Sequence, residues 1–157
     1  MSAFAVNLLF ALVWGLATGS LSEVSLIVGF LVGMVVLHVA GMAIGDRRYV
    51  VRIARFAALF VTFVWELIAS SVRVTATVLS PGLTMRPAVI AVPLDVTRDV
   101  EITLLANLIT LTPGTLTIDV ANDRSCLYVH AMHGEDPERV ASDIKRTFER
   151  RIMEAFR

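Results

Sequence analysis

Two long apolar stretches at the N-terminus constrain the fold of this chain more than any other feature. Ala3–Ala17 carries no charge and one strongly polar residue, Asn7. After the polar break TGSLSE, a second run extends from Leu26 to Ile44. At ~1.5 Å per residue, the first run is a short span of a ~30 Å hydrocarbon core, and the second is close to a full one. We predict a helical hairpin in a lipid bilayer.

A secretory signal peptide is the competing interpretation of the first run. The residues before it include no lysine or arginine, and the second apolar run follows almost at once. Both features argue for a retained span.

Composition agrees with a membrane protein. Of the 157 residues, 56% are hydrophobic and 18% are charged, and the mean hydropathy is +0.73, which is too apolar for an ordinary soluble domain. Residues 1–85 hold three acids and five bases, whereas residues 86–157 hold eleven acids and nine bases. Neither half has the basic surplus that nucleic-acid binding requires, so we expect no nucleic-acid partner.

The orientation of the hairpin follows from its basic residues. Four of the five bases of the first half fall within DRRYVVRIAR, residues 46–55. The positive-inside rule places this segment in the cytoplasm, so the hairpin is expected to enter and leave from that side.

Small and ionisable residues within the second run are candidates for packing or function. Gly29 and Gly33, and again Gly41 and Gly45, are four residues apart, which predicts flat grooves where a helix of a partner subunit could approach closely. His38 is either a neutral histidine bonded to a neighbour, which we favour, or a proton relay.

The third apolar segment, residues 56–80, has its polar residues on one helical face. The polar stripe consists of Arg52, Arg55, Thr62, Glu66, Ser70, Arg73 and Thr77. The helix either spans the bilayer or lies in the interface with the stripe toward water or a partner, and the charges favour the second arrangement. Glu66 is either an ion site or, as we prefer, a carboxylate that pairs with Arg73 or another subunit, with Ser70 beside it.

The break at Ser80–Pro87 divides the chain into a membrane region, 1–80, and a small cytoplasmic domain, 81–157. We predict a strand at 88–94 with Pro93 at an edge or bulge, a helix capped by Asp99, and a hairpin around residues 122–124. On the first hairpin strand, Leu116, Ile118 and Val120 alternate with Thr115, Thr117 and Asp119, so one face is expected to be buried.

A final helix is predicted from an apolar repeat at every fourth residue, which consists of Val140, Ile144, Phe148, Ile152 and Phe156. The resulting fold class is a membrane α-helical N-terminal half, a helical hairpin plus a long amphipathic third helix, followed by an α+β domain of β-α-β-β-α order. The two helices of that domain are expected on one side of a three-stranded sheet.

The segment LITLTPGTLTIDV joins the predicted helix to the hairpin. Its turn residues, Thr112, Pro113, Gly114 and Thr115, end the helix because proline cannot continue it and glycine permits a positive φ. Their threonines are interpreted as turn and cap hydroxyls, not nucleophiles.

No catalytic, metal or cofactor site is predicted. His130, His133 and Asp136 match no established ligand spacing, and the single Cys126 has no partner for a disulfide or a metal site. The chain is therefore not expected to be an enzyme.

The text FVWELIASSVRVTATVLSP, RPAVIAVPLD, ANLITLTPGTLTIDV and LYVHAM resembles the E-type chain of Mrp/Mnh/Pha-type multisubunit monovalent cation/proton antiporters. The resemblance covers nearly the whole chain, and residues 107–119 are its most specific part. It implies an accessory subunit of a bacterial plasma-membrane complex for sodium/proton exchange, with the other antiporter subunits and the bilayer as partners. The alternative is a standalone membrane-anchored binding module with a cytoplasmic docking domain.

Overall fold

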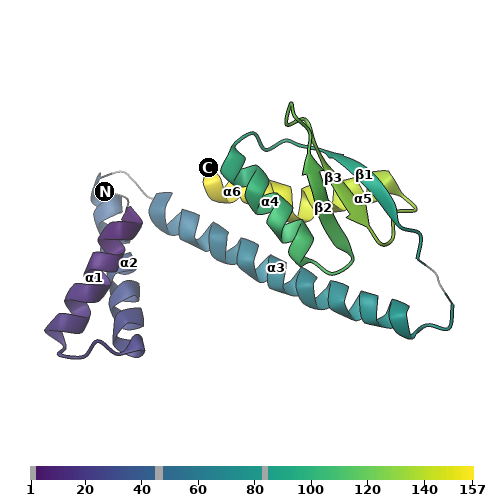
Figure 1. Cartoon of the computed structure of the whole chain (residues 1–157). Coiled ribbons are helices and arrows are strands. Elements are labelled where there is room, and N and C mark those ends of the chain that lie inside the picture. The colour runs from purple at the N-terminus through teal and green to yellow at the C-terminus, as the bar shows by residue number, and fades with distance from the viewer. Residues whose placement is uncertain (1–2, 45–47, 83–84) are drawn as a thin grey trace. The chain divides into compact units, whose positions relative to one another are not determined.

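A computed structural model describes residues 3–44, 48–82 and 85–157, so Gly45 lies outside the described residues (Figure 1). The chain forms two compact units, residues 1–54 and 55–157. A helical N-terminal part precedes a small domain with a three-stranded antiparallel sheet, as predicted. The boundary between the units falls within the third helix, α3 (Arg48–Leu79), so most of that helix packs with the C-terminal domain.

The N-terminal unit is a hairpin of α1 (Ala3–Ala17) and α2 (Glu23–Ile44). Gly19 turns the chain with a φ of +69°, and the Ser20 N–H donates to the Gly15 carbonyl at 3.0 Å. Near the other end of the hairpin, the Phe4 and Phe30 rings meet edge to face with centroids 6.2 Å apart. Glu23–Gly41 is long and apolar enough to cross a membrane, and Ala3–Ala17 is a shorter apolar helix.

The helices of this hairpin touch at glycines. A Cβ atom on Gly29 would lie 2.7 Å from Trp14 Cβ, and one on Gly33 would lie 2.8 Å from Phe10 Cβ. The surface that we expected to receive a partner's helix is thus occupied by α1 of the same chain. Gly41 lies further along α2 and is partly buried.

The C-terminal domain contains a mixed set of helices and strands. In chain order these are β1 (Ala88–Pro93), α4 (Asp99–Leu111), β2 (Thr115–Val120), β3 (Cys126–Ala131), α5 (Pro137–Ile144), a π-helical turn (Lys145–Glu149) and α6 (Arg150–Phe156). The antiparallel strand order is β1-β3-β2. Pro93, which cannot donate a ladder hydrogen bond, therefore stands on an edge strand.

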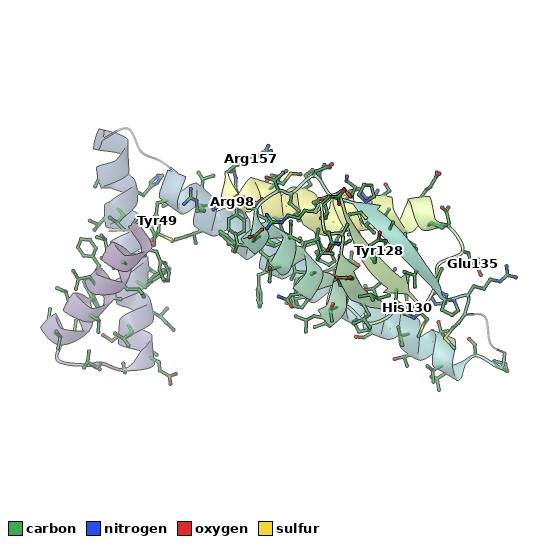
Figure 2. The ribbon with its side chains drawn as sticks, turned by 45° about the horizontal axis from the view of Figure 1, so that its top comes forward. Tyr49, Arg98, Tyr128, His130, Glu135 and Arg157 are labelled. Carbon is green, nitrogen blue, oxygen red and sulfur yellow. The ribbon has the colours of Figure 1, made fainter. Side chains whose placement is uncertain are left out.

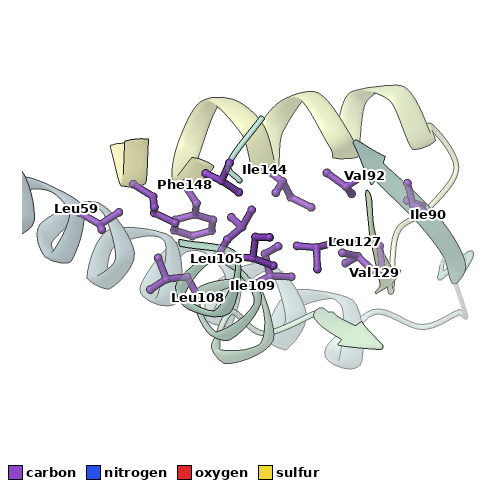
Figure 3. Packing of buried hydrophobic residues seen from close by; sticks show 14 residues of the cluster. Leu59, Ile90, Val92, Leu105, Leu108, Ile109, Leu127, Val129, Ile144 and Phe148 are labelled. Atoms are coloured by element: carbon purple, nitrogen blue, oxygen red, sulfur yellow. The ribbon is translucent and has the colours of Figure 1, made fainter. Parts of the chain in front are cut away.

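The core lies between the sheet and the helices, as Figure 3 shows. Val92, Leu127 and Val129 of the sheet face Leu105 of α4 and Ile152 of α6, and all five are fully buried. Because α4 and α6 both supply residues to this one cluster, the helices cover the same face of the sheet.

The burial of β2 differs from the usual apolar-in pattern. Leu116 and Ile118 are 48% and 54% exposed, whereas the Thr117 hydroxyl donates to the Ala106 carbonyl of α4 at 3.1 Å. A shift in register between Thr117 and Asp119 interrupts the pairing with β3. The threonine face therefore packs against α4, and Leu116 and Ile118 lie on the open face of the sheet, whereas Val120, beyond the shift in register, packs against the core.

The open face continues onto β3, where Figure 2 shows Tyr128 and His130. His130 stands opposite Val89 of β1 and Leu116 of β2 in the two ladders. Alternate residues of a strand share a face, so these side chains form one surface.

A π-helical turn accounts for the apolar repeat at every fourth residue from Val140 to Phe156. Four residues of an α-helix turn about 400°, so the repeat from Val140 to Phe156 drifts by about 160°. The Arg150 N–H bonds the Lys145 carbonyl five residues back, a π-helical turn that accommodates one extra residue and removes about 100° of this drift. Ile144, Phe148 and Ile152 consequently remain in the core.

The start of α4 differs by one residue from the prediction. Asp99 is the first helical residue and Arg98 is the N-cap. Asp99 instead pairs with Arg124 at 2.7 Å, and the Arg98 N–H is 3.5 Å from Glu101 Oε2. An acid in the first helical turn still faces the positive end of the helix dipole.

α3 packs along the C-terminal domain. Leu59 is buried within the domain core, and the Phe56 ring meets the Phe156 ring edge to face at 5.3 Å. Arg55 Nη1 donates to the Glu154 carbonyl at 2.7 Å. Most of this helix is thus a structural part of the domain, although Tyr49–Leu79 is long and apolar enough to cross a membrane.

Candidate functional site

The polar stripe of α3 and the turn after α4 meet at a pocket of about 350 Å³, here called the α3 pocket. Within the C-terminal unit, this pocket joins the two groups of residues that the sequence singled out. Its lining comprises Glu66, Ser70, Arg73 and Val74 of α3, Ile109 and Thr112–Thr115 of the turn, Ala131, His133, and the residues Val140, Asp143, Ile144, Arg146, Thr147 and Phe148 of the last helix.

The wall formed by α3 is held together by contacts along its own helix. Arg73 Nη2 lies 3.5 Å from Glu66 Oε2, and the two side chains are 68% and 29% exposed. Ser70 is buried, and its hydroxyl donates to the Glu66 carbonyl. Arg73, one of the two partners that the sequence suggested for Glu66, thus lies within ion-pair distance of it.

The turn forms the second wall. The Thr112 hydroxyl donates to the Leu108 carbonyl at 2.8 Å, and the Thr115 hydroxyl donates to the Ile109 carbonyl at 2.8 Å. Gly114 has a φ of +93°, and a Cβ atom on it would lie 3.4 Å from Val74 Cγ2. The hydroxyls thus satisfy free carbonyls at the end of α4, while glycine lets the turn approach α3.

The last helix and His133 form the third wall, which carries both acidic and basic side chains. Arg146 Nη2 lies 2.9 Å from Asp143 Oδ1 on the same helix. His133 Nε2 lies 3.4 Å from the Thr77 hydroxyl of α3. The charged groups of the α3 pocket are thus paired within their own helices, whereas the contact between Thr77 and His133 joins α3 to the rest of the domain.

The other candidate groups are dispersed. Asp136 caps α5, accepting from the Arg139 N–H at 3.0 Å, while His130 lies on the open sheet face and His133 borders the α3 pocket. Among the described residues, no three His, Cys, Asp or Glu side chains are grouped to hold a metal ion. His38 lies in α2, and within the described residues its buried Nδ1 has no hydrogen-bond partner.

Charge also organises the turn of the hairpin. The Ser125 hydroxyl donates to Asp123 Oδ1 at 2.7 Å, and together with the Ser125 N–H it holds the pKa of Asp123 below its usual range. Arg124 adopts a φ of +59° beside it. These contacts fix the turn between β2 and β3 and contribute to the stability of the hairpin.

Sequence reasoning missed the two most deeply buried polar residues, Asn7 and Glu149. Glu149 is 1% exposed, and its Oε1 accepts from the N–H groups of Asp95 at 2.6 Å and Val96 at 3.1 Å. Asn7 is fully buried, and its Nδ2 donates to the Tyr49 hydroxyl at 3.0 Å. The position of Asn7, a lone polar residue in an apolar helix, could have indicated a buried hydrogen bond. Glu149 could not be distinguished from the other charged residues of the last helix by its sequence context.

Comparison with known proteins identifies the family. The family model described as Na+/H+ ion antiporter subunit matches residues 7–155. The chain belongs to this family. The matched residues include both the apolar hairpin and the C-terminal domain. The match confirms the resemblance seen in the sequence.

Curated members of the antiporter subunit family align along most of their length. The E-type chain of the Na(+)/H(+) antiporter of Bacillus subtilis is 38% identical over 152 residues, which are 97% of this chain and 96% of that protein. The corresponding Na(+)/H(+) antiporter chain of Alkalihalophilus pseudofirmus is 37% identical over 149 residues, 95% of this chain and 94% of that protein.

Two solved structures of large complexes contain similar chains. A chain of the membrane-bound sulfane sulfur reductase, an archaeal respiratory membrane complex, superposes with a TM-score of 0.61 at 25% identity, with 98% of both chains covered. A chain of the Mrp complex from Dietzia sp. superposes with a TM-score of 0.51 at 28% identity, covering 66% of this chain and 96% of that one.

Proposed function

We propose that the chain is an accessory integral-membrane subunit of a multisubunit monovalent cation/proton antiporter in a bacterial plasma membrane. The observation that carries the proposal is the family match, because it includes residues 7–155 and so both units of the chain. The similar chains in solved membrane complexes support other antiporter subunits as partners. As part of a transporter of sodium or another monovalent cation, the chain serves pH and sodium homeostasis and is not an enzyme.

The accessory role is supported by the α3 pocket. Its carboxylates, Glu66 and Asp143, are paired with Arg73 and Arg146. An ion path needs groups that exchange ions or protons, and acids that already have a cationic partner serve structure more readily. The chain would thus support assembly, while other subunits carry the proton path.

The packing of α3 supports a position in the membrane interface. Tyr49–Leu79 is long and apolar enough to cross a bilayer. However, its contacts with the C-terminal domain run from Arg55 to Thr77, which is about 33 Å along the helix, the thickness of a whole hydrocarbon core. A spanning α3 would carry the charged domain into lipid, at a prohibitive cost. We infer two spans, α1 and α2, and a cytoplasmic C-terminal domain.

Co-purification tests the subunit function. A tagged chain extracted from its native membranes in mild detergent is expected to elute together with large membrane proteins. Elution of the chain alone would contradict the proposal and favour a standalone membrane-anchored binding module.

Glu66→Gln is expected to reduce the yield of assembled complex and to leave cation/proton exchange per complex unchanged. The exposed Glu66–Arg73 pair contributes at most ~1 kcal/mol, so the yield should fall by less than about fivefold. Exchange is measured in vesicles and divided by the complex content. Glu135→Gln is the matched control, because it removes a more exposed ion pair of the same length, 3.5 Å between Arg86 and Glu135. An intact complex that has lost transport would make Glu66 part of an ion path.

A further inference from the structure

A second groove lies beside the α3 pocket on the C-terminal unit. It measures about 480 Å³ and has two chemically different walls. Val61, Thr62, Trp65 and Glu66 of α3 form one wall, and Arg146, Thr147, Arg150 and Arg151 form the other. Three arginines therefore face one carboxylate, and we call this site the arginine groove.

The arginines differ in how they are paired. Arg146 and Arg150 each have an acid on their own helix, Asp143 at 2.9 Å and Glu154 at 3.8 Å, and these pairs are largely exposed. The Nε atom of Arg151 is buried, and within the described residues it has no hydrogen-bond partner. Among the described residues Arg151 forms no ion pair with an acid, so its guanidinium is available to an anion that enters the groove.

An apolar surface begins at the same groove. Val61, Trp65, Ile68 and Val72 follow helical spacing along α3 and are well exposed, Trp65 at 68%. This apolar stripe lies about half a helical turn away from Leu59 and Ser70, the residues of α3 that are buried against the domain. The arginine groove and the apolar stripe together match a molecule with an anionic head and a hydrocarbon tail.

We propose that the arginine groove binds the headgroup of an anionic phospholipid, whose acyl chain lies along the apolar stripe of α3. Guanidinium groups suit a phosphate because their planar N–H donors can bind two of its oxygens at once. Trp65 is amphipathic and would lie at the level of the headgroups. The lipid would fix the depth and rotation of α3 in the membrane surface. The proposal rests on the interfacial position of α3 proposed above.

The test uses the full-length chain in detergent, with Trp14→Phe so that Trp65 is the only tryptophan. Fluorescence is recorded while dioctanoyl phosphatidylglycerol, dioctanoyl phosphatidylcholine or inorganic phosphate is added. We expect phosphatidylglycerol to shift the Trp65 emission at a lower concentration than phosphatidylcholine, and phosphate to produce no shift at those concentrations. Equal responses to the two lipids, or the same shift with phosphate alone, would overturn the proposal.

Variants locate the site. Arg151→Gln is expected to weaken phosphatidylglycerol binding about fivefold, the usual effect of one basic residue near an anionic surface. Arg150→Gln, on the exposed rim, provides the same test if the first variant does not fold. Arg139→Gln, on the exposed surface of α5 outside the groove, is the matched control and should bind like the parent. Unchanged binding by both groove variants would refute the site. The titration reports on lipid binding alone, whereas co-purification reports on the subunit function. Either result can therefore be negative while the other is positive.

Discussion

Gly33→Leu is expected to separate α1 from α2 and to prevent accumulation of the folded hairpin. The first atom of the new side chain would already lie 2.8 Å from Phe10 Cβ, on the side of α2 that also faces Asn7. Overpacking of this kind costs ~1–3 kcal/mol, and displacement of Asn7 from Tyr49 adds the cost of an unpaired buried amide. No rotamer of leucine avoids the clash, because it involves Cβ itself.

Chemical cross-linking measures the effect of Gly33→Leu. Phe4→Cys and Phe30→Cys are introduced with Cys126→Ser, because the two phenylalanine rings are 6.2 Å apart. A short bismaleimide should join them efficiently in the parent and poorly in the Gly33→Leu variant. Val35→Leu adds bulk to an exposed position of the same helix and should cross-link like the parent. Equal cross-linking of all three proteins would show that the glycine contact does not hold the hairpin.

Glu149→Leu is expected to lower the free energy of unfolding of the C-terminal domain by ~3 kcal/mol or more. It leaves the N–H groups of Asp95 and Val96 without an acceptor, and each buried unpaired N–H costs ~1–3 kcal/mol. Glu149→Gln retains an oxygen at the accepting position and should lose about 1 kcal/mol, chiefly its weaker contact with Lys145.

Urea unfolding of the full-length chain in detergent, followed by circular dichroism, measures the effect of Glu149→Leu. Hydrogen exchange of the Asp95 and Val96 amides should accelerate in the same variant. Glu154→Leu, at an exposed position of the same helix, is the control and should change little. If Glu149→Leu were as stable as the parent, the carboxylate would not be what fixes the connection between β1 and α4.

The sequence was sufficient for features that depend on local periodicity. The apolar runs predicted α1 and α2, and Asp99 marked the start of α4 to within one residue. Proline and glycine marked the turn between α4 and β2. In each case neighbouring residues along the chain decide the structure, so no knowledge of tertiary contacts was necessary.

Features that depend on tertiary partners could not be predicted in the same way. Alternation on β2 predicted that the threonines and Leu116 and Ile118 lie on opposite faces. It could not show that the threonine face would be the one that packs against α4. Glycine spacing indicated close packing, yet the sequence could not show that α1 would supply the neighbour. The every-fourth-residue repeat of the last helix did contain the signal of a π-helical turn, because a regular α-helix would carry Phe156 off the core face.

The sidedness of the C-terminal domain is the most direct test of a two-span anchor with α3 in the interface. Single cysteines are placed, with Cys126→Ser, at Ser20 between α1 and α2 and at Asn122 in the exposed turn between β2 and β3. Intact cells are then treated with a membrane-impermeant maleimide. We predict that Ser20→Cys is labelled, and that Asn122→Cys is labelled only after the cells are opened. Labelling of Asn122→Cys in intact cells would place the domain outside and contradict the proposed topology.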